Sequence, residues 1–269
     1  MELSLKEFER LRTEYYQQRN EGHINEDLQK KLAPYRVDNA IIMAAGKSTR
    51  FVPFSYHKPK ALAEVRGEIL IERQIRQLQE AGIKEIYLVV GYKKETLLYL
   101  KDKFGIHIIE NPDFARYNNT STLMCVRQHL ANSYICSADN YFTENPFESY
   151  VYRPYYAAVY AEGETTEWCL DYDEQDRITA VTIGGRDAWY MLGHAYFDRA
   201  FSNKFLHLLQ QQWYELPMVR EHLWEDLYRK YLDELVLYIR KYKTGVIYEF
   251  DSLEELALFD PQSPAFLKQ

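Results

Sequence analysis

The stretch that decides the fold is AIIMAAGKSTRFVPFSYHKPKAL, which covers residues 40–62. It begins as an apolar run typical of a buried strand and continues into a loop with one glycine, Gly46. A glycine after a strand allows a tight turn, and consecutive backbone N–H groups there can bind phosphate oxygens. The loop also carries four cations: Lys47, Arg50, Lys58 and Lys60. The combination predicts an anion-binding site without Walker spacing, with solvated surface cations as the alternative.

Apolar strands and amphipathic helices alternate after this stretch. Helical spacing covers residues 70–81, 93–104 and 120–130, and the segments EIYLVVG, IHIIEN and SYICSADN between them have strand composition. Such alternation predicts parallel strands joined by right-handed crossovers, with ligands at the carboxyl ends of the strands. We therefore expect an α/β fold with a Rossmann-like, mixed but mostly parallel sheet.

The pattern changes after Tyr141. Four short alternating segments, YYAAVYAEG, EWCLDYD, RITAVTIGG and WYMLGHAYF, predict an inserted mixed or antiparallel sheet. Helices are expected at about 198–213 and 219–232. The run LVLYIRKYKTGVIYEFDS then indicates strand, turn and strand before a closing helix.

The N-terminal segment has a different pattern. Ser4 and Glu7 have the spacing of a capping box, and apolar residues at helical spacing predict one helix from residue 4 to about 32, ended by Pro34. We expect an N-terminal helical extension at 1–37, one main α/β domain at 38–260 and a tail at 261–269.

Composition limits the classes of function. The 269 residues are 46% hydrophobic and carry a net charge of −7, so a well-buried core is expected and nucleic acid is a poor partner. Three cysteines without a CxxC pair suit a reducing cytoplasm. No signal peptide or long apolar run occurs, which predicts a cytoplasmic protein without membrane insertion. The sequence leaves a homo-oligomer open.

Carboxylates follow two apolar strands. Asp139 ends the run SADN, and Glu249 and Asp251 lie in YEFDS. Mg²⁺ is often bound by one or two carboxylates together with substrate phosphates, so Asp139 and Asp251 would suffice as ligands. The alternative is that each is a turn former or a helix N-cap.

The run MAAGKSTRFVPFSYHKPKAL resembles the AAGxGxR and PKAL signature of nucleotidyltransferases with the sugar-nucleotide pyrophosphorylase fold, which is GT-A-like. Ser48 stands at the second signature glycine. The segments YNNTSTL, LANSYICSADNYF, TTEW and IYEFDS extend the resemblance over about residues 38–259 to the bacterial CTP:phosphocholine cytidylyltransferases.

The resemblance implies a reaction in which the phosphate of phosphocholine attacks the α-phosphorus of CTP with Mg²⁺ present, giving CDP-choline and pyrophosphate. Lys60 would stabilise the transition state, Arg50 would bind the leaving group, and Asp139 and Asp251 would hold the metal. The residues implied to contact the nucleotide are Ala44, Ala45, Gly46, Lys47, Ser48, Gly91, Tyr92, Asn118, Asn119 and Ser121.

The acceptor site is also implied by resemblance. A trimethylammonium group is bound by aromatic faces, helped by nearby carboxylates. The segments TTEW and LWEDLY supply such residues, with further aromatic walls near residue 190. The implied acceptor residues are Glu167, Trp168, Tyr190, Tyr196, Trp224, Glu225 and Asp226, with Trp189 as an additional wall.

The sequence also fits other acceptors and one function without catalysis. Phosphoethanolamine or 2-aminoethylphosphonate would fit the same acidic residues through charged hydrogen bonds, whereas a sugar 1-phosphate suits them less well. A catalytically inactive nucleotide-binding module is the alternative outside enzymes, and the presence of Lys60, Asp139 and Asp251 argues against it.

Overall fold

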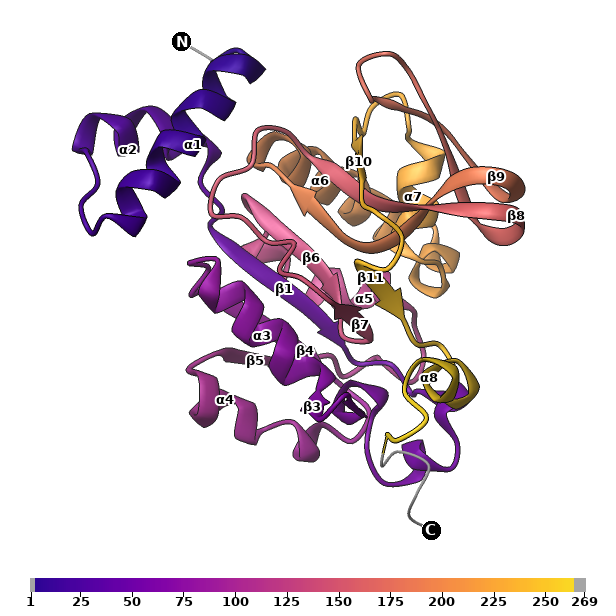
Figure 1. The fold of residues 1–269 in the computed structure, drawn as a ribbon. Coiled ribbons are helices and arrows are strands. Elements are labelled where there is room, and N and C mark those ends of the chain that lie inside the picture. The colour runs from indigo at the N-terminus through magenta and orange to yellow at the C-terminus, as the bar shows by residue number, and fades with distance from the viewer. Residues whose placement is uncertain (1–2, 264–269) are drawn as a thin grey trace.

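A seven-stranded sheet organises the protein in a computed structural model that describes residues 3–263 (Figure 1). The strand order is β10-β8-β9-β6-β1-β4-β5, with parallel pairing everywhere except at β6·β9 and β8·β9. This confirms the predicted mixed, mostly parallel sheet. The strands are β1 (Asn39–Ala44), β4 (Ile86–Val90), β5 (His107–Glu110), β6 (Ser133–Ser137), β8 (Tyr155–Tyr172), β9 (Ile178–Phe197) and β10 (Tyr238–Lys241).

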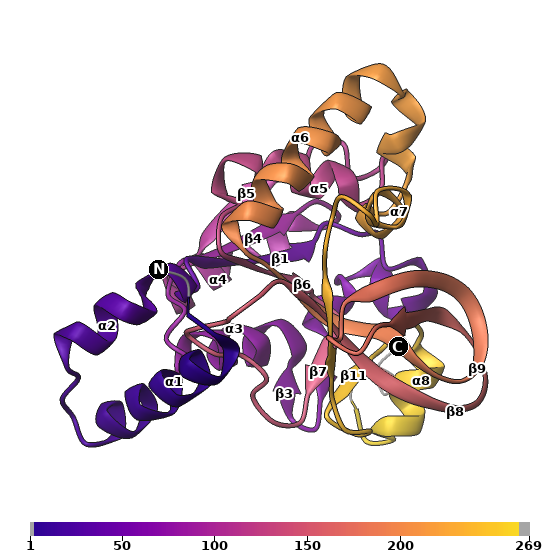
Figure 2. The ribbon, with the colours of Figure 1, turned by 90° about the horizontal axis from the view of Figure 1, so that it is seen from above.

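Helices cover both faces of the sheet, with α3 on one side and α5, α6 and α7 on the other (Figure 2). Successive residues of β1 point to opposite faces: Ile42 packs in the cluster with α3, and Ile41 packs in the cluster with α5 to α7. Burial on both faces explains the continuous apolar strand runs. The helices are α3 (Leu70–Glu80), α4 (Tyr99–Phe104), α5 (Asn119–Cys125), α6 (Arg199–Glu215), α7 (Trp224–Lys230) and α8 (Leu253–Phe259).

Shorter elements complete the domain. Two small antiparallel pairs join β2 (Glu64–Val65) to β3 (Glu68–Ile69) and β7 (Asn140–Phe142) to β11 (Ile247–Glu249). The 3₁₀ turns are η1 (Ala33–Tyr35), η2 (Thr49–Phe51), η3 (Phe54–Tyr56), η4 (Lys60–Leu62), η5 (Lys94–Thr96), η6 (Arg127–His129) and η7 (Pro217–Glu221).

The antiparallel pairing predicted after Tyr141 is confirmed, but its strands belong to the central sheet and do not form a sheet of their own. The four short segments are the two long strands β8 and β9, which continue the central sheet through the antiparallel pairing of β9 with β6. Beyond the sheet the two strands form a ribbon that curls, and Cys169 pairs with both Thr182 and Tyr190 (Figure 2). Several register shifts interrupt the alternation of side chains although the strands continue.

The N-terminal segment contains two helices, α1 (Leu5–Asn20) and α2 (Glu26–Leu32), where one was predicted. Gly22, with φ +82°, lies in the turn after α1, and the Asn25 side chain caps α2. Ser4 caps α1 as expected. The two helices enclose a small aromatic and leucine cluster that includes Phe8.

The boundaries at 37 and 260 stay a prediction, and the predicted tail lies mostly at 264–269, outside the described residues. None of the helices among residues 3–263 has the length and apolar composition needed to cross a bilayer.

Candidate active site

The loop after β1 begins at the carboxyl end of the central strand. The residue with left-handed backbone there is Ser48, with φ 54° and ψ 39°, and not Gly46. The chain bends at Gly46 as expected, but without the left-handed backbone that would require a glycine there. A Cβ at Gly46 would meet nothing within 4 Å, so the protein itself leaves open space beside this glycine. Ser48 takes a conformation that favours glycine, and its Oγ accepts a hydrogen bond from the backbone N–H of Lys60 at 3.0 Å.

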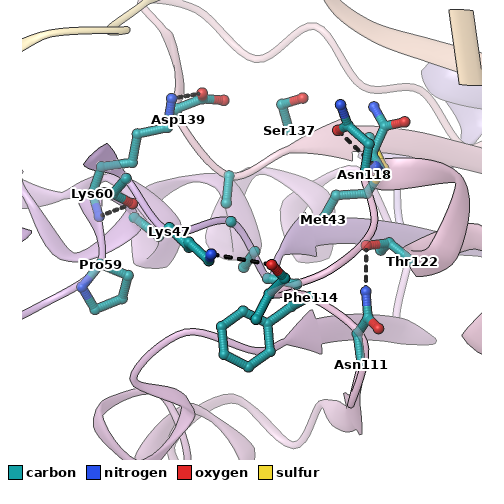
Figure 3. Close-up of a pocket in the computed structure, with 18 of the residues that line it drawn as sticks. Met43, Lys47, Pro59, Lys60, Asn111, Phe114, Asn118, Thr122, Ser137 and Asp139 are labelled. Atoms are coloured by element: carbon teal, nitrogen blue, oxygen red, sulfur yellow. Dashed lines mark hydrogen bonds and ion pairs between the residues drawn. The ribbon is translucent and has the colours of Figure 1, made fainter. Parts of the chain in front are cut away.

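This loop forms one wall of the first cavity, which has a volume of about 590 Å³ (Figure 3). Lys60 and Asp139 also line it, and Lys47 donates to the carbonyl oxygen of Ala115 at 3.1 Å along its wall. Most of the residues implied to contact a nucleotide surround this cavity: Ala44, Ala45, Gly46, Lys47, Ser48, Asn118 and Asn119.

The other three implied nucleotide residues lie behind the wall. A Cβ at Gly91 would come within 2.6 Å of Phe114, so only glycine lets that aromatic residue pack at the cavity. The hydroxyl of Tyr92 donates to Ser55 O at 2.7 Å. Ser121 donates to Asn118 O at 2.7 Å. Tyr92 and Ser121 thus make structural hydrogen bonds, and neither is a lining residue of the first cavity.

Lys60 lies at the centre of the charged groups. Its ammonium pairs with Asp139 and lies 3.3 Å from Asp251 Oδ1, and Arg50 pairs with the same Asp251 oxygen at 2.8 Å. Burial alone would lower the pKa of Lys60, but the neighbouring carboxylates outweigh it and raise the pKa. Lys60 is therefore held in its charged form.

The pairing of β7 with β11 brings together acidic residues that are far apart in the sequence. Glu249 is paired with Asn140 in this antiparallel ladder. Asp139, just before β7, and Asp251, just after β11, therefore lie at the same end of the pair. Oxygens of Asp139, Glu249 and Asp251, the carboxylate cluster, all lie within 4.8 Å of one another. Burial and the two aspartates raise the pKa of Glu249.

The alternative in which Asp251 caps a helix does not hold. Ser252 is the N-cap of α8, and its Oγ accepts from the Glu255 N–H at 3.2 Å. Glu255 in turn accepts from the backbone N–H of Asp251 at 2.7 Å, which leaves the Asp251 carboxylate for the cluster. The predicted proximity of Asp139 and Asp251 is confirmed.

A second cavity of about 280 Å³ is lined by Glu249 and Asp251 of the carboxylate cluster, whereas Asp139 lines the first cavity. Of the implied acceptor residues, Glu167 and Tyr190 line it. Burial first, and then the charges of Asp251 and Glu255, raise the pKa of Glu167. Further aromatic and acidic lining residues are Tyr160, Tyr248 and Glu255.

Trp168 and Trp224, which were predicted to bind the acceptor, are not lining residues of this cavity. Trp168 follows Glu167 on β8 and packs with the core on the α7 side of the sheet, with the Arg229 guanidinium 5.3 Å from its ring centroid. Trp224 is 1% exposed and stacks on Tyr156 at a centroid distance of 5.6 Å. Trp224 is therefore a core residue, whereas Trp168 is half-buried at the edge of this core.

The remaining implied acceptor residues also lie elsewhere. Tyr196 is 1% exposed in the core. Trp189 packs against the Tyr160 ring at 5.5 Å between centroids. Asp226 accepts from the Leu223 N–H at 3.1 Å at the start of α7. Glu225 accepts hydrogen bonds from other protein groups, so its contacts suit a supporting position.

Several residues that line the two cavities were not predicted from the sequence. Glu249 stood among the strand-end carboxylates but not in the metal pair, because its proximity to Asp139 depends on the β7·β11 pairing. Tyr160 and Tyr248 lie in no motif that marks them as binding residues, and only their aromatic side chains could have suggested this role. Asn111, which directly follows β5 and lines the first cavity, shared the strand-end position used to select Asp139.

The comparisons with known proteins agree with this architecture. The model of the MobA-like NTP transferase domain matches residues 40–201, from β1 into α6. The chain belongs to this family of nucleotidyltransferases. The Streptococcus pneumoniae choline-phosphate cytidylyltransferase is 35% identical over 216 residues, which are 80% of this chain and 94% of that protein.

A second sequence relative and a solved structure are also similar to this chain. A 2-aminoethylphosphonate cytidylyltransferase from Lancefieldella rimae is 33% identical over 82% of this chain and 92% of its own length. The solved CTP:phosphocholine cytidylyltransferase from Streptococcus pneumoniae superposes with a TM-score of 0.81 at 33% identity, over 84% of this chain and 98% of that chain. The expected nucleotidyltransferase fold is confirmed.

Proposed function

We propose that this protein is a cytidylyltransferase that transfers CMP from CTP to phosphocholine, giving CDP-choline and pyrophosphate. The observation that carries the proposal is the position of Lys60 and the carboxylate cluster between two cavities. Group transfer between two substrates needs such a junction. The first cavity takes CTP and the second takes the acceptor, and the identity of both substrates rests on the similarity to the two cytidylyltransferases.

The chemistry needs charge stabilisation more than proton transfer. An acceptor phosphate oxygen bonds to the α-phosphorus of CTP, the bond from that phosphorus to the bridging oxygen breaks, and pyrophosphate leaves. A phosphate is already anionic at neutral pH, so positioning and electrostatics carry the rate. We assign Lys60 to the charge that develops at the α-phosphate. Arg50, whose guanidinium is exposed beside Asp251, is assigned to the leaving pyrophosphate.

The carboxylate cluster fits Mg²⁺. Its oxygens lie within 4.8 Å of one another, and the buried Oδ1 of Asp139 has no hydrogen-bond partner within the described part of the chain. Mg²⁺ prefers oxygen ligands and is often bound by one or two carboxylates. We propose Asp139 and Asp251 as the ligands, with Glu249 beside them. When bound, the ion supplies positive charge to the phosphate oxygens.

The second cavity suits a cationic headgroup. Tyrosine faces attract a quaternary ammonium, and carboxylates such as Glu167 add charge attraction. A primary ammonium would donate hydrogen bonds to the same carboxylates. 2-Aminoethylphosphonate is therefore the second candidate acceptor, favoured by the acidic lining and by the Lancefieldella relative.

Two other points follow from the proposal. The contacts of Lys60 with Asp139 and Asp251 favour an active enzyme over an inactive nucleotide-binding module. We assign the reaction to the cytoplasm, in keeping with three cysteines that are unpaired.

A pyrophosphate-release assay tests the proposal. CTP and MgCl₂ are held constant, and phosphocholine, phosphoethanolamine, 2-aminoethylphosphonate and glucose 1-phosphate are supplied in turn, with EDTA as the metal control. We expect the highest kcat/KM for phosphocholine and no release in EDTA. A tenfold or larger preference for 2-aminoethylphosphonate or phosphoethanolamine would replace the acceptor, and release with none of the four would overturn the function.

A further inference from the structure

Glu225 lies on α7 behind the wall of the first cavity and joins two other elements. Its Oε2 accepts from Asn119 Nδ2 at 3.3 Å, and its Oε1 accepts from the Tyr156 hydroxyl at 3.2 Å. Asn119 is the first residue of α5, and Tyr156 lies on β8. The carboxylate thus connects a helix, a strand and the helix that carries it.

Asn119 is the residue through which this contact reaches the cavity. It lines the first cavity, and its Oδ1 accepts from the backbone N–H of Trp224 at 2.7 Å. Both ends of its amide group are therefore bound by α7. Rotation of the Asn119 side chain would break a hydrogen bond to Trp224 or to Glu225 and leave a mostly buried polar group unpaired.

We infer that Glu225 is a positioning residue for nucleotide binding, which fixes the side chain of Asn119 in the cavity wall and does not itself contact the acceptor. The inference rests on the proposed function, since it takes the first cavity as the CTP site. Glu225 is not a lining residue of the first or second cavity. The stacking of Tyr156 on Trp224 holds the opposite side of the carboxylate in place.

A double-mutant cycle tests this coupling. Glu225→Gln keeps the side-chain volume but removes the negative charge and one of the two acceptor oxygens, so the hydrogen bond from Asn119 loses its charge assistance or its acceptor. We expect the Kd for CTP, measured by titration calorimetry, to rise about three- to tenfold, as for the loss of one hydrogen bond. Asn119→Ala should raise it similarly, and the double variant should bind no more weakly than Asn119→Ala.

Several readouts separate positioning from general destabilisation. Partial unfolding would lower the binding stoichiometry and leave the Kd of the folded molecules unchanged. The KM for phosphocholine should not change in Glu225→Gln. Asp233→Asn, which removes the same charge at an exposed site just after α7, is the matched control and should leave the Kd unchanged. If Glu225→Gln does not fold, Glu225→Asp shortens the reach to Asn119 and should raise the Kd in the same direction.

Additive effects of the two substitutions would overturn the inference, as would a raised KM for phosphocholine with an unchanged Kd for CTP. A wild-type protein that does not bind CTP would overturn the proposed function and the inference with it. A wild type that binds CTP, with variants that bind it equally well, would overturn the inference alone.

Discussion

Replacement of Lys60 by alanine is the most informative single change in this protein. The ammonium contacts Asp139 and lies 3.3 Å from Asp251, and its side chain is 22% exposed. Loss of one preorganised charge at a transition state commonly lowers kcat about 10²- to 10³-fold, or about 3–4 kcal/mol in activation free energy. Burial and the two aspartates raise the pKa of Glu249, which favours its uncharged form and reduces the repulsion that loss of the ammonium would leave. The free energy of unfolding should therefore change less than the activation free energy.

The assay is steady-state pyrophosphate release with CTP and phosphocholine, with urea unfolding of the same preparations. Lys58→Ala is the matched control, since Lys58 is an exposed cation two residues away in the same loop. We expect Lys58→Ala to keep its turnover. A folded Lys60→Ala protein with unchanged kcat would refute the assignment of Lys60, and a parallel loss of folded protein would show a structural role instead.

The other predictions concern the metal, the acceptor and pH. Asp251→Asn should raise the MgCl₂ concentration needed for half-maximal activity by about tenfold or more, and an unchanged requirement in the assay would remove it from the ligand set. Tyr190→Ala should raise the KM for phosphocholine about two- to thirtyfold in steady-state kinetics. Trp224→Ala should instead lower the unfolding free energy, measured in urea, by about 3–5 kcal/mol. If Trp224→Ala raised the KM and Tyr190→Ala lowered the stability, Trp224 would belong to the acceptor site. Burial raises the pKa of Glu225 from 4.5 to about 7, so its stabilising contribution is fully present below pH 4.5 and is lost as the pH rises through 7. At about 1.4 kcal/mol per pKa unit the loss is on the order of 3 kcal/mol, and the gap between wild type and Glu225→Gln should shift by that amount between pH 4.5 and 8; a gap that does not change with pH would contradict it.

The central sheet could be predicted because its strands are buried on both faces and stand out as apolar runs between amphipathic helices. The ribbon of β8 and β9 could not, because its register shifts break the alternation of side chains while the backbone pairing continues. The N-terminal helix was extended too far because two local signals were not used: Gly22, which takes a positive φ after α1, and Asn25, which caps α2.

Part of the candidate site could also be predicted from the sequence, and part could not. Asp139 and Asp251 could be selected because each carboxylate directly follows an apolar strand run. They meet because β7 and β11 pair antiparallel, which brings the start of β7 beside the end of β11. The acceptor residues could not be chosen from motifs alone. Glu167 and Trp168 are adjacent on a strand, so their side chains point to opposite faces, and only the carboxylate reaches the second cavity. Trp224 has the residue type of a cation-binding wall but is covered by the core.

The central claim is that the groups around Lys60 join CMP to a phosphorylated amine at the junction of two cavities. Phosphorus NMR of the wild-type protein with CTP, phosphocholine and MgCl₂ tests it most directly. We predict that the signals of CTP and phosphocholine decrease together while those of CDP-choline and pyrophosphate appear in equal amounts. Formation of orthophosphate or free CMP without CDP-choline, or no consumption of CTP, would contradict the claim.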